Sequence, residues 1–356
     1  MGRMGFTIFR RGEFAVTVDP SLIVILGLLG YYPGVTLTEL LAWIGVAAGC
    51  ILAHELGHAL AFAAYGATPR VLLYGMGGLT SASGSFSAAK GVIISLAGPI
   101  AGFGVGGVFW LVGPGQTDLS QTIYYYGLWA TFGFGLLNLL PVLPLDGGQA
   151  LVSALKMGRV QEAEKIARYV SVLVAGAGAL LLFRSGLPFS WIFPLMFLGQ
   201  NVADLRRMRE EPTRERVRAA FQALLSGRPA DAARVSQEVL DQRPSYEIAE
   251  VAAETLVWSY LAMGQVSEAR ASLDVRPARA HGDQRPVERL PEAAVALAEG
   301  AGEPALAVIA ASLDKGEWAP PNVLIPLLER SGSLAGVRAR VGADGAALLA
   351  KLQAAL

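Results

Sequence analysis

Apolar residues follow two different patterns along the chain. The first 204 residues contain long, nearly uninterrupted apolar runs, whereas residues 205–356 show the apolar and charged periodicity that is typical of amphipathic helices. The runs that are long enough to enter or cross a membrane are 21–32, 38–65, 90–113, 122–155, 166–183 and 188–204. The pattern predicts an all-α chain, in which a membrane bundle of six spans precedes a soluble helical part.

The first apolar run is short for a span. Its twelve residues rise about 18 Å in a helix, against about 30 Å for the apolar core of a bilayer, so it spans only with help from its flanks. With the N-terminus in the cytoplasm, the only outer basic residue is Arg184. The basic residues of the cytoplasmic segments are Arg3, Arg10, Arg11, Arg70, Lys90, Lys156, Arg159, Lys165 and Arg168, followed by an Arg-rich stretch after residue 204. The positive-inside rule therefore favours six spans with both termini in the cytoplasm.

The soluble part contains an internal repeat. The pattern Gly-x-x-x-x-Ala recurs with spacings of 37 and 36 residues, and each Gly ends one apolar-periodic helix while each Ala lies early in the next. The repeats are Gly227–Ala232, Gly264–Ala269 and Gly300–Ala305, and the predicted helix pairs are 215–226 with 229–242, 246–263 with 266–273, and 289–299 with 303–313. The period is close to the roughly 34 residues of tetratricopeptide repeats, which predicts a short solenoid with capping helices at 322–355 and a flexible loop at 274–287. An unrelated helical bundle is the alternative.

Composition and charge agree with this division and exclude several classes of protein. Of the 356 residues, 53% are apolar and 16% are charged, and 29 Lys and Arg balance 29 Asp and Glu. Only 19 of the charged residues precede residue 205. The zero net charge argues against a strongly basic nucleic-acid-binding protein, and a single cysteine, Cys50, excludes a disulfide scaffold. We therefore expect a membrane domain at 1–205, a linker at 206–213 and a cytoplasmic helical domain at 214–356.

Residues 54–58, in the second expected span, read His-Glu-Leu-Gly-His. One helical turn separates His54 from His58, so both imidazoles point to the same side and can bind one zinc ion. Glu55 lies beside them, where its carboxylate can take a proton from a water molecule at the metal. Two histidines that simply pack in a helix bundle are the alternative. Ionisable residues in a membrane span are costly and usually functional, which favours the metal site.

A catalytic zinc site of this kind needs a third protein ligand. Asp146 is the only acidic residue of the fourth expected span, and it lies in Asn-Leu-Leu-Pro-Val-Leu-Pro-Leu-Asp-Gly, residues 138–147, where prolines interrupt the helix. Along their spans, His58 and Asp146 lie roughly 10 and 15 Å from the cytoplasmic ends, which is a similar depth. The alternative role for Asp146 is that of a helix N-cap.

The Gly- and Ser-rich stretch 73–87 does not fit a spanning helix. Residues 71–74 and 79–81 favour a small re-entrant β-hairpin that dips into the cytoplasmic leaflet, and a free strand edge there would capture an unwound substrate by strand addition. An interfacial loop with no role in substrate binding explains the composition equally well.

These motifs resemble those of the site-2 protease family of intramembrane zinc metalloproteases. Residues 54–58 match the His-Glu-x-x-His motif of that family, and residues 138–147 match its Asn-x-x-Pro-x-x-Pro-x-Asp-Gly motif. The stretches 18–21 and 97–99 resemble the family more loosely. The resemblance covers roughly residues 7–204, and the two main motifs occur in the family's order, about 90 residues apart.

The resemblance implies a role for each residue of the motifs. His54, His58 and Asp146 are then the ligands of one Zn²⁺ ion. Glu55 is the catalytic base, and Asn138 holds the substrate or the developing oxyanion. The implied function is regulated intramembrane proteolysis of a transmembrane protein substrate, in a multi-pass protein of the bacterial inner membrane, with a cytoplasmic protein partner for the helical repeats. The alternative is a catalytically silent scaffold that recruits such a partner, but the presence of all four ligand and base residues argues against it.

Overall fold

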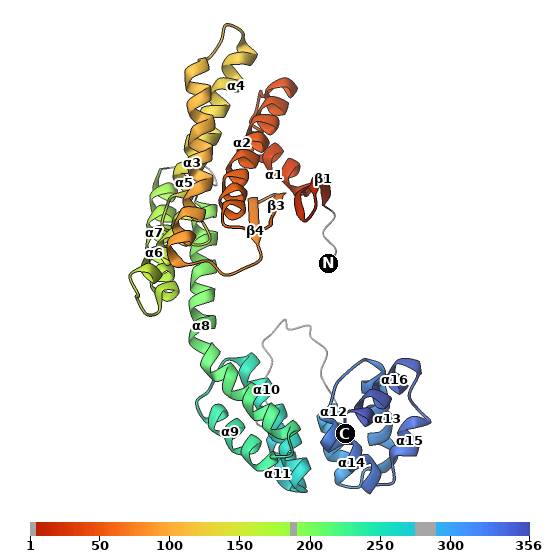
Figure 1. Cartoon of the computed structure of the whole chain (residues 1–356). Coiled ribbons are helices and arrows are strands. Elements are labelled where there is room, and N and C mark those ends of the chain that lie inside the picture. The colour runs from red at the N-terminus through yellow and green to blue at the C-terminus, as the bar shows by residue number, and fades with distance from the viewer. Residues whose placement is uncertain (1–4, 186–190, 275–289) are drawn as a thin grey trace. The chain divides into compact units, whose positions relative to one another are not determined.

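The structure, a computed structural model, describes residues 5–185, 191–274 and 290–356 (Figure 1). Contacts within the chain divide it into two compact units, an N-terminal unit, Met1–Arg206, and a C-terminal unit, Arg207–Leu356. Helices predominate in both units, as expected. The prediction of an all-α chain with one small hairpin is nevertheless incomplete, because the described residues of the N-terminal unit also form a four-stranded sheet.

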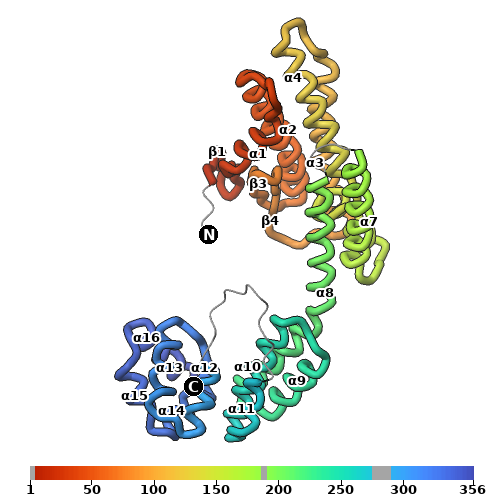
Figure 2. Tube along the Cα trace, turned by 180° about the vertical axis from the view of Figure 1, so that it is seen from behind, coloured from red at the N-terminus to blue at the C-terminus, as the bar shows by residue number. Residues whose placement is uncertain are grey.

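Three helices of the described residues are long and apolar enough to cross a membrane. They are α2 (Leu37–Ala64), α3 (Ala88–Val112) and α7 (Ala163–Arg184). α2 begins at a capping box, in which the Thr36 hydroxyl accepts the backbone N–H of Glu39 and the Glu39 carboxylate accepts the backbone N–H of Thr36. α2 and α3 pack side by side (Figure 1 and Figure 2). All three helices lie where the apolar runs predict them, whereas α1 (Ser21–Gly30) is short, and the total of six spans stays a prediction.

The fourth apolar run is not one helix. It contains α4 (Asp118–Leu128), the π-helix η1 (Trp129–Gly133), α5 (Phe134–Asn138) and, after a turn, α6 (Asp146–Met157). Pro141 and Pro144 lie in the turn, where they lack the backbone N–H that a continuing helix needs. The interruption expected within 122–155 is therefore confirmed, and it lies at the two prolines.

The sheet of the N-terminal unit has the strand order β1–β2–β3–β4. Its strands are β1 (Phe6–Arg11), β2 (Phe14–Val18), β3 (Pro69–Tyr74) and β4 (Gly77–Ala82). β2 and β3 pair in parallel, and the other two pairs are antiparallel. β3 and β4 form the expected hairpin, whereas the β1–β2 hairpin has no counterpart among the expected elements. The buried residues of this region are Val16, Leu22, Leu26, Trp43, Ala47, Ala59, Val71 and Leu73, and they join the sheet to α1 and α2.

α8 (Ile192–Leu225) begins in the N-terminal unit and continues into the C-terminal unit. Residues 206–213, expected as a linker, are helical and lie inside α8, with Pro212 included in the helix. The span expected at 188–204 falls mostly on the first part of α8, and its residues 188–190 lie outside the described residues. One helix is thus common to both units.

The C-terminal unit consists of helices. After α8 these are α9 (Pro229–Asp241), α10 (Tyr246–Met263), α11 (Val266–Asp274), α12 (Leu290–Ala298), α13 (Gly302–Asp314), α14 (Pro321–Arg330), α15 (Leu334–Arg338) and α16 (Ala343–Ala354). Gly227, Gly264 and Gly300 follow three of these helices with φ angles of 75°, 74° and 95°, a conformation that favours glycine at helix ends. The helix ends at the three repeat glycines are therefore confirmed. The expected start of the first repeat helix at 215 is wrong, because residues 215–225 are the last part of the longer α8. The flexible loop expected at 274–287 lies outside the described residues, except for its first residue.

Candidate metal centre

Two histidines of α2 and the first residue of α6 come together in the N-terminal unit. His54 Nε2 lies 2.9 Å from Asp146 Oδ2, His58 Nε2 lies 3.3 Å from Asp146 Oδ1, and the two Nε2 atoms are 3.2 Å apart. His54 and Asp146 are 92 residues apart in the sequence. Within the described part of the chain, these three side chains form the one group of His, Cys, Asp or Glu whose donor atoms are close enough together to hold a metal ion.

The backbone before α6 explains why Asp146 points to the histidines. The N-cap of α6 is Leu145 and makes no side-chain cap, while Asp146 lies in the first turn, so the alternative role of Asp146 as an N-cap is wrong. A carboxylate in the first turn also interacts favourably with the helix dipole. A Cβ on Gly147 would overlap with the backbone of the preceding turn, and one on Gly148 would lie 2.6 Å from the backbone nitrogen of Leu143. The two glycines therefore let the turn pack directly on the start of α6.

A backbone carbonyl fixes the orientation of His58. His58 Nδ1 lies 2.7 Å from the carbonyl oxygen of Ile94 in α3. Because a carbonyl only accepts hydrogen bonds, Nδ1 carries the proton and donates it, and in the neutral ring Nε2 keeps the lone pair that can bind a metal ion. Histidine ligands of metal ions commonly make such a contact through the second ring nitrogen. The tautomer that this contact selects is the one that a ligand needs.

Glycines let α2 and α3 approach each other beside the histidines. A Cβ on Gly57 would overlap with the carbonyl oxygen of Ala97. A Cβ on Gly98 would overlap with the His58 ring and would lie 2.7 Å from His54 Nε2. The two imidazoles therefore occupy space that is free only because position 98 has no side chain.

The carboxylate of Glu55 contacts β4 and is not one of the converging donor groups. Glu55 is 5% exposed, and its Oε2 accepts a hydrogen bond of 2.6 Å from Thr80 Oγ1, which also lies 3.1 Å from the Glu55 carbonyl oxygen. A Cβ on Gly78 would overlap with the Glu55 side chain, so β4 covers it directly. Thr80 is not among the residues that the sequence indicates. Its only signal is a hydroxyl in the expected hairpin, whose register cannot be read from the sequence.

Two other residues near the motifs stand apart from the donor group. Asn138 ends α5, eight residues before Asp146, and is half-buried. In the part of the chain that the structure describes, no hydrogen bond joins it to the donor residues or to Glu55, so its role stays a prediction. Cys50, one turn before His54, is buried and does not belong to the group, which agrees with a packing role.

The donor set fits a zinc ion. In a tetrahedral site with bonds of about 2.1 Å, ligand atoms lie about 3.4 Å apart. The two imidazole Nε2 atoms are 3.2 Å apart, and they lie 2.9 and 3.3 Å from Oδ2 and Oδ1 of the Asp146 carboxylate, respectively. With neutral imidazoles, the carboxylates of Asp146 and Glu55 leave two negative charges. Among the described residues, neither carboxylate forms an ion pair with a lysine or arginine. Because the burial of uncompensated charge is costly, a divalent cation would balance these charges.

Comparisons with known proteins agree with the two-part organisation. The sequence model of Peptidase family M50 matches residues 115–182, and the sequence model of a tetratricopeptide repeat matches residues 223–290. Among solved structures, the site-2 protease from Methanocaldococcus jannaschii is similar, with 21% sequence identity and a TM-score of 0.43, over 56% of this chain and 95% of that chain. A comparison with curated proteins gives no match.

These matches confirm the resemblance to site-2 proteases, which belong to Peptidase family M50, and to tetratricopeptide repeats. The M50 match includes Asp146 and the turn before it, but it begins after the two histidines and Glu55. It therefore supports the reaction class of a metalloprotease, while the roles of individual side chains stay predictions.

Proposed function

We propose that this protein is an intramembrane zinc metalloprotease, which hydrolyses a peptide bond within or near a transmembrane helix of a protein substrate. The proposal rests on the convergence of two imidazoles of α2 with the carboxylate of Asp146, next to the buried Glu55. Three apolar helices of spanning length support a membrane setting, and the M50 match supports the reaction class. A scaffold protein without activity would not need these four side chains together.

In this proposal His54, His58 and Asp146 hold the zinc ion. When bound, the ion supplies Lewis acidity toward a water molecule and toward the peptide carbonyl. The hydrogen bond from His58 Nδ1 to the carbonyl of Ile94 keeps Nε2 free to act as a ligand. Asn138 is proposed to hold the substrate or the developing oxyanion, on the strength of the motif resemblance alone.

Glu55 is the proposed general base and acid. Its carboxylate takes a proton from the attacking water and delivers it to the nitrogen of the leaving amine, which requires a carboxylate within hydrogen-bond reach of both groups. The hydroxyl of Thr80 donates a hydrogen bond of 2.6 Å to Glu55 Oε2 and restricts its rotation. The close approach of the Gly78 backbone restricts it further. β4 is therefore proposed to position the catalytic base as well as to cover it.

The same strand offers a place for the substrate. β4 is the last strand in the order of the sheet, and among the described residues no other strand pairs with its outer edge. Gly78 and Thr80 contact Glu55, while Leu79 between them is 48% exposed. An unwound substrate segment that adds to this edge would bring its peptide bonds beside Glu55. We propose that the hairpin is re-entrant and presents the substrate in this way.

The surroundings of the site complete the proposal. The N-terminal unit is proposed to cross a bacterial inner membrane six times, with both termini in the cytoplasm, as the distribution of Lys and Arg predicts. The C-terminal unit, which matches a tetratricopeptide repeat over part of its length, is proposed to bind a cytoplasmic protein partner or to recruit substrate. Proteolysis would then be regulated through that unit.

Two variants of the full-length protein test the proposed function. Wild type should contain about one zinc ion per chain, and Glu55→Gln should keep this zinc and lose cleavage by about 10²-fold or more. The double variant His54→Ala, His58→Ala should lose both the bound zinc and the cleavage activity. Glu39→Gln, a change at the exposed start of the same helix, is the control and should change neither.

Because the substrate is a transmembrane protein of unknown identity, cleavage is measured by comparing membrane proteomes of cells with wild type and with Glu55→Gln. A protein that accumulates uncut in the variant identifies the substrate, which then serves in purified assays. Equal zinc content in wild type and in the double histidine variant would contradict the metal site. Equal turnover in wild type and Glu55→Gln would contradict the proposed role of Glu55, and an inactive, zinc-free wild type would favour the scaffold.

A further inference from the structure

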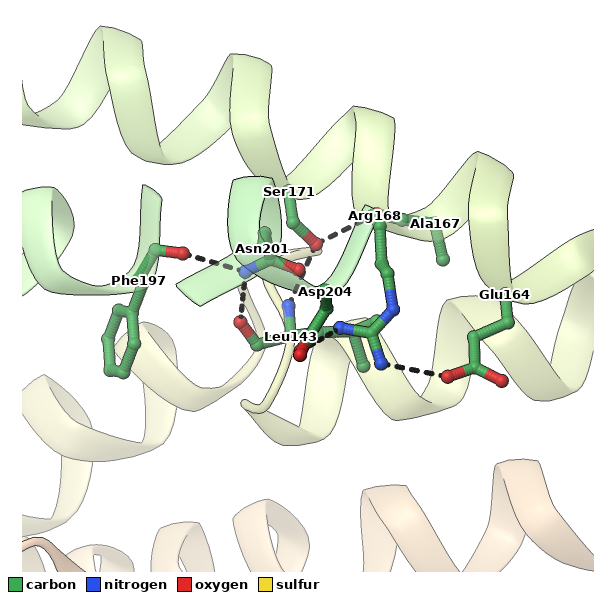
Figure 3. A network of polar contacts seen from close by, with 8 residues as sticks. All are labelled: Leu143, Glu164, Ala167, Arg168, Ser171, Phe197, Asn201 and Asp204. Atoms are coloured by element: carbon green, nitrogen blue, oxygen red, sulfur yellow. Dashed lines mark hydrogen bonds and ion pairs between the residues drawn. The ribbon is translucent and has the colours of Figure 1, made fainter. Parts of the chain in front are cut away.

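The turn between α5 and α6 is held from two sides by buried polar side chains (Figure 3). The backbone N–H of Leu143 donates a hydrogen bond of 2.8 Å to Ser171 Oγ in α7. The carbonyl oxygen of Leu143 accepts one of 2.7 Å from Asn201 Nδ2 in α8. Both side chains belong to residues that are 0% exposed. Both backbone polar groups of one residue are thus satisfied by side chains from two other helices.

Each of these side chains is also bound to its own helix. Ser171 Oγ donates to the carbonyl of Ala167 at 2.7 Å while it accepts from Leu143, so its hydroxyl acts as donor and acceptor at once. Asn201 Nδ2 donates to the carbonyl of Phe197 at 2.8 Å as well as to Leu143, which uses both amide hydrogens. Neither side chain is free to rotate without losing two hydrogen bonds. The side chains of Ser171 and Asn201, called the two braces below, therefore link α7 and α8 to the turn in a fixed position.

The braced residue lies three positions before the proposed metal ligand Asp146. The backbone N–H of Leu145 donates to the carbonyl of Val142 at 2.8 Å, which closes the turn around Leu143. The start of α6 packs on the same segment, because a Cβ on Gly148 would lie 2.6 Å from the Leu143 nitrogen. A displacement of Leu143 would therefore be passed on to Asp146 through a short and tightly packed piece of backbone.

A charged contact joins the same two helices one turn away. Arg168 of α7 donates to Asp204 of α8 at 2.6 Å and to Glu164 at 2.8 Å. Arg168 lies three residues before Ser171 on α7, and Asp204 lies three residues after Asn201 on α8. Figure 3 shows the ion pair and the contacts to Leu143 along one seam between α7 and α8. The ion pair thus links α7 and α8 close to the two side chains that contact the turn.

We propose that Ser171 and Asn201 are positioning residues for the metal centre, which hold Asp146 at ligand distance from the two histidines by bracing Leu143. Irregular backbone at membrane depth needs protein partners for its polar groups. Here those partners come from helices that supply no ligand themselves. The inference rests on the proposed function, because it assigns the turn a task in zinc binding.

Zinc affinity of the full-length protein in detergent tests the inference, measured by competition with a chelator. Ser171→Ala removes the acceptor for the Leu143 N–H, and Asn201→Leu removes the donor to its carbonyl at similar side-chain volume. We expect each variant to bind zinc at least about tenfold more weakly than wild type, as is usual when contacts that orient a ligand are lost. Co²⁺ in place of zinc should show an altered visible absorption spectrum in both variants, because the spectrum reports ligand geometry.

Two matched controls separate positioning from a general loss of stability. Thr131→Val removes a buried hydroxyl that bonds the carbonyl four residues earlier at 2.7 Å, as Ser171 does, but that does not contact the turn. Asn322→Ala removes an amide that donates to the carbonyl of Leu224 at 2.7 Å in the C-terminal unit. Both controls should keep zinc affinity within about twofold of wild type and leave the Co²⁺ spectrum unchanged.

The outcomes distinguish this inference from the proposed function. Variants at Ser171 and Asn201 that unfold at lower temperature but bind zinc as tightly as wild type would overturn the inference, because the braces would then only stabilise the fold. Equal weakening of zinc binding by Thr131→Val would also overturn it. A wild-type protein that binds no zinc would instead overturn the proposed function, and the inference with it.

Discussion

Replacing Gly98 by alanine is the smallest change that we expect to destroy the metal centre. Gly98 lies within α3, and the imidazoles of His54 and His58 occupy the space beside it. A Cβ at this position would overlap with the His58 ring and would lie 2.7 Å from His54 Nε2. α3 packs on α6 as well as on α2, which limits how far its backbone can move away from the histidines.

The size of the effect follows from contact distances. Unstrained contacts between heavy atoms of this kind begin at about 3.5 Å, so His54 Nε2 has to move by roughly 0.8 Å and the His58 ring by more. Metal sites tolerate deviations of about 0.2 Å in their ligand distances. We therefore expect zinc affinity to fall at least about 100-fold, which corresponds to roughly 2.7 kcal/mol. Helix propensity acts in the opposite direction, since alanine is favoured over glycine by about 1 kcal/mol inside a helix.

The assay compares zinc affinity and substrate cleavage of Gly98→Ala with those of Gly104→Ala in the full-length protein. Gly104 lies in the same helix, and a Cβ there would meet no atom within 4 Å beyond its own stretch of helix. The control should keep both properties within about twofold of wild type. Zinc affinity of Gly98→Ala equal to that of wild type would refute the reasoning, because the histidines would then not need the space that the glycine leaves.

Three further predictions concern the base, the topology and the C-terminal unit. Thr80→Val removes the hydroxyl that holds Glu55, so kcat should fall about tenfold or more at unchanged zinc content. Thr80→Ser keeps a hydroxyl and should have a kcat close to that of wild type. A kcat of Thr80→Val equal to that of wild type would contradict the positioning role. Reporter fusions after Gly115 and after Arg159 should report the outside and the cytoplasm, and the same side for both would exclude the six-span topology. The fragment 207–356 should be soluble, helical and zinc-free, and its deletion should leave zinc binding intact; loss of zinc on deletion would show that the C-terminal unit supports the site.

The long helices could be predicted from the sequence because a membrane span needs about 20 apolar residues, and few other structures produce such runs. α2, α3 and α7 lie where the runs predict, and the break before α6 lies at its two prolines. The sheet was only half predictable. β1 is exposed along its whole length and shows no alternation of buried and exposed residues, and β2 pairs with β3 more than 50 residues later in the chain. Strands that owe their pairing to such distant partners carry little local signal.

The converging donor residues could be predicted because few residue types bind zinc, and the chain has only three histidines. The groups that hold these residues in place could not. His58 is oriented by the carbonyl of Ile94, Glu55 by the hydroxyl of Thr80, and the turn before Asp146 by side chains of α7 and α8. Every residue offers a carbonyl, and hydroxyl and amide side chains are common, so none of these contacts restricts the sequence enough to be recognised in it. They join residues 25 to 58 positions apart, and only the packing of the helices on the hairpin selects them. Residue type determines what the site can bind, and tertiary contacts determine its geometry, which is why only the first could be read from the sequence.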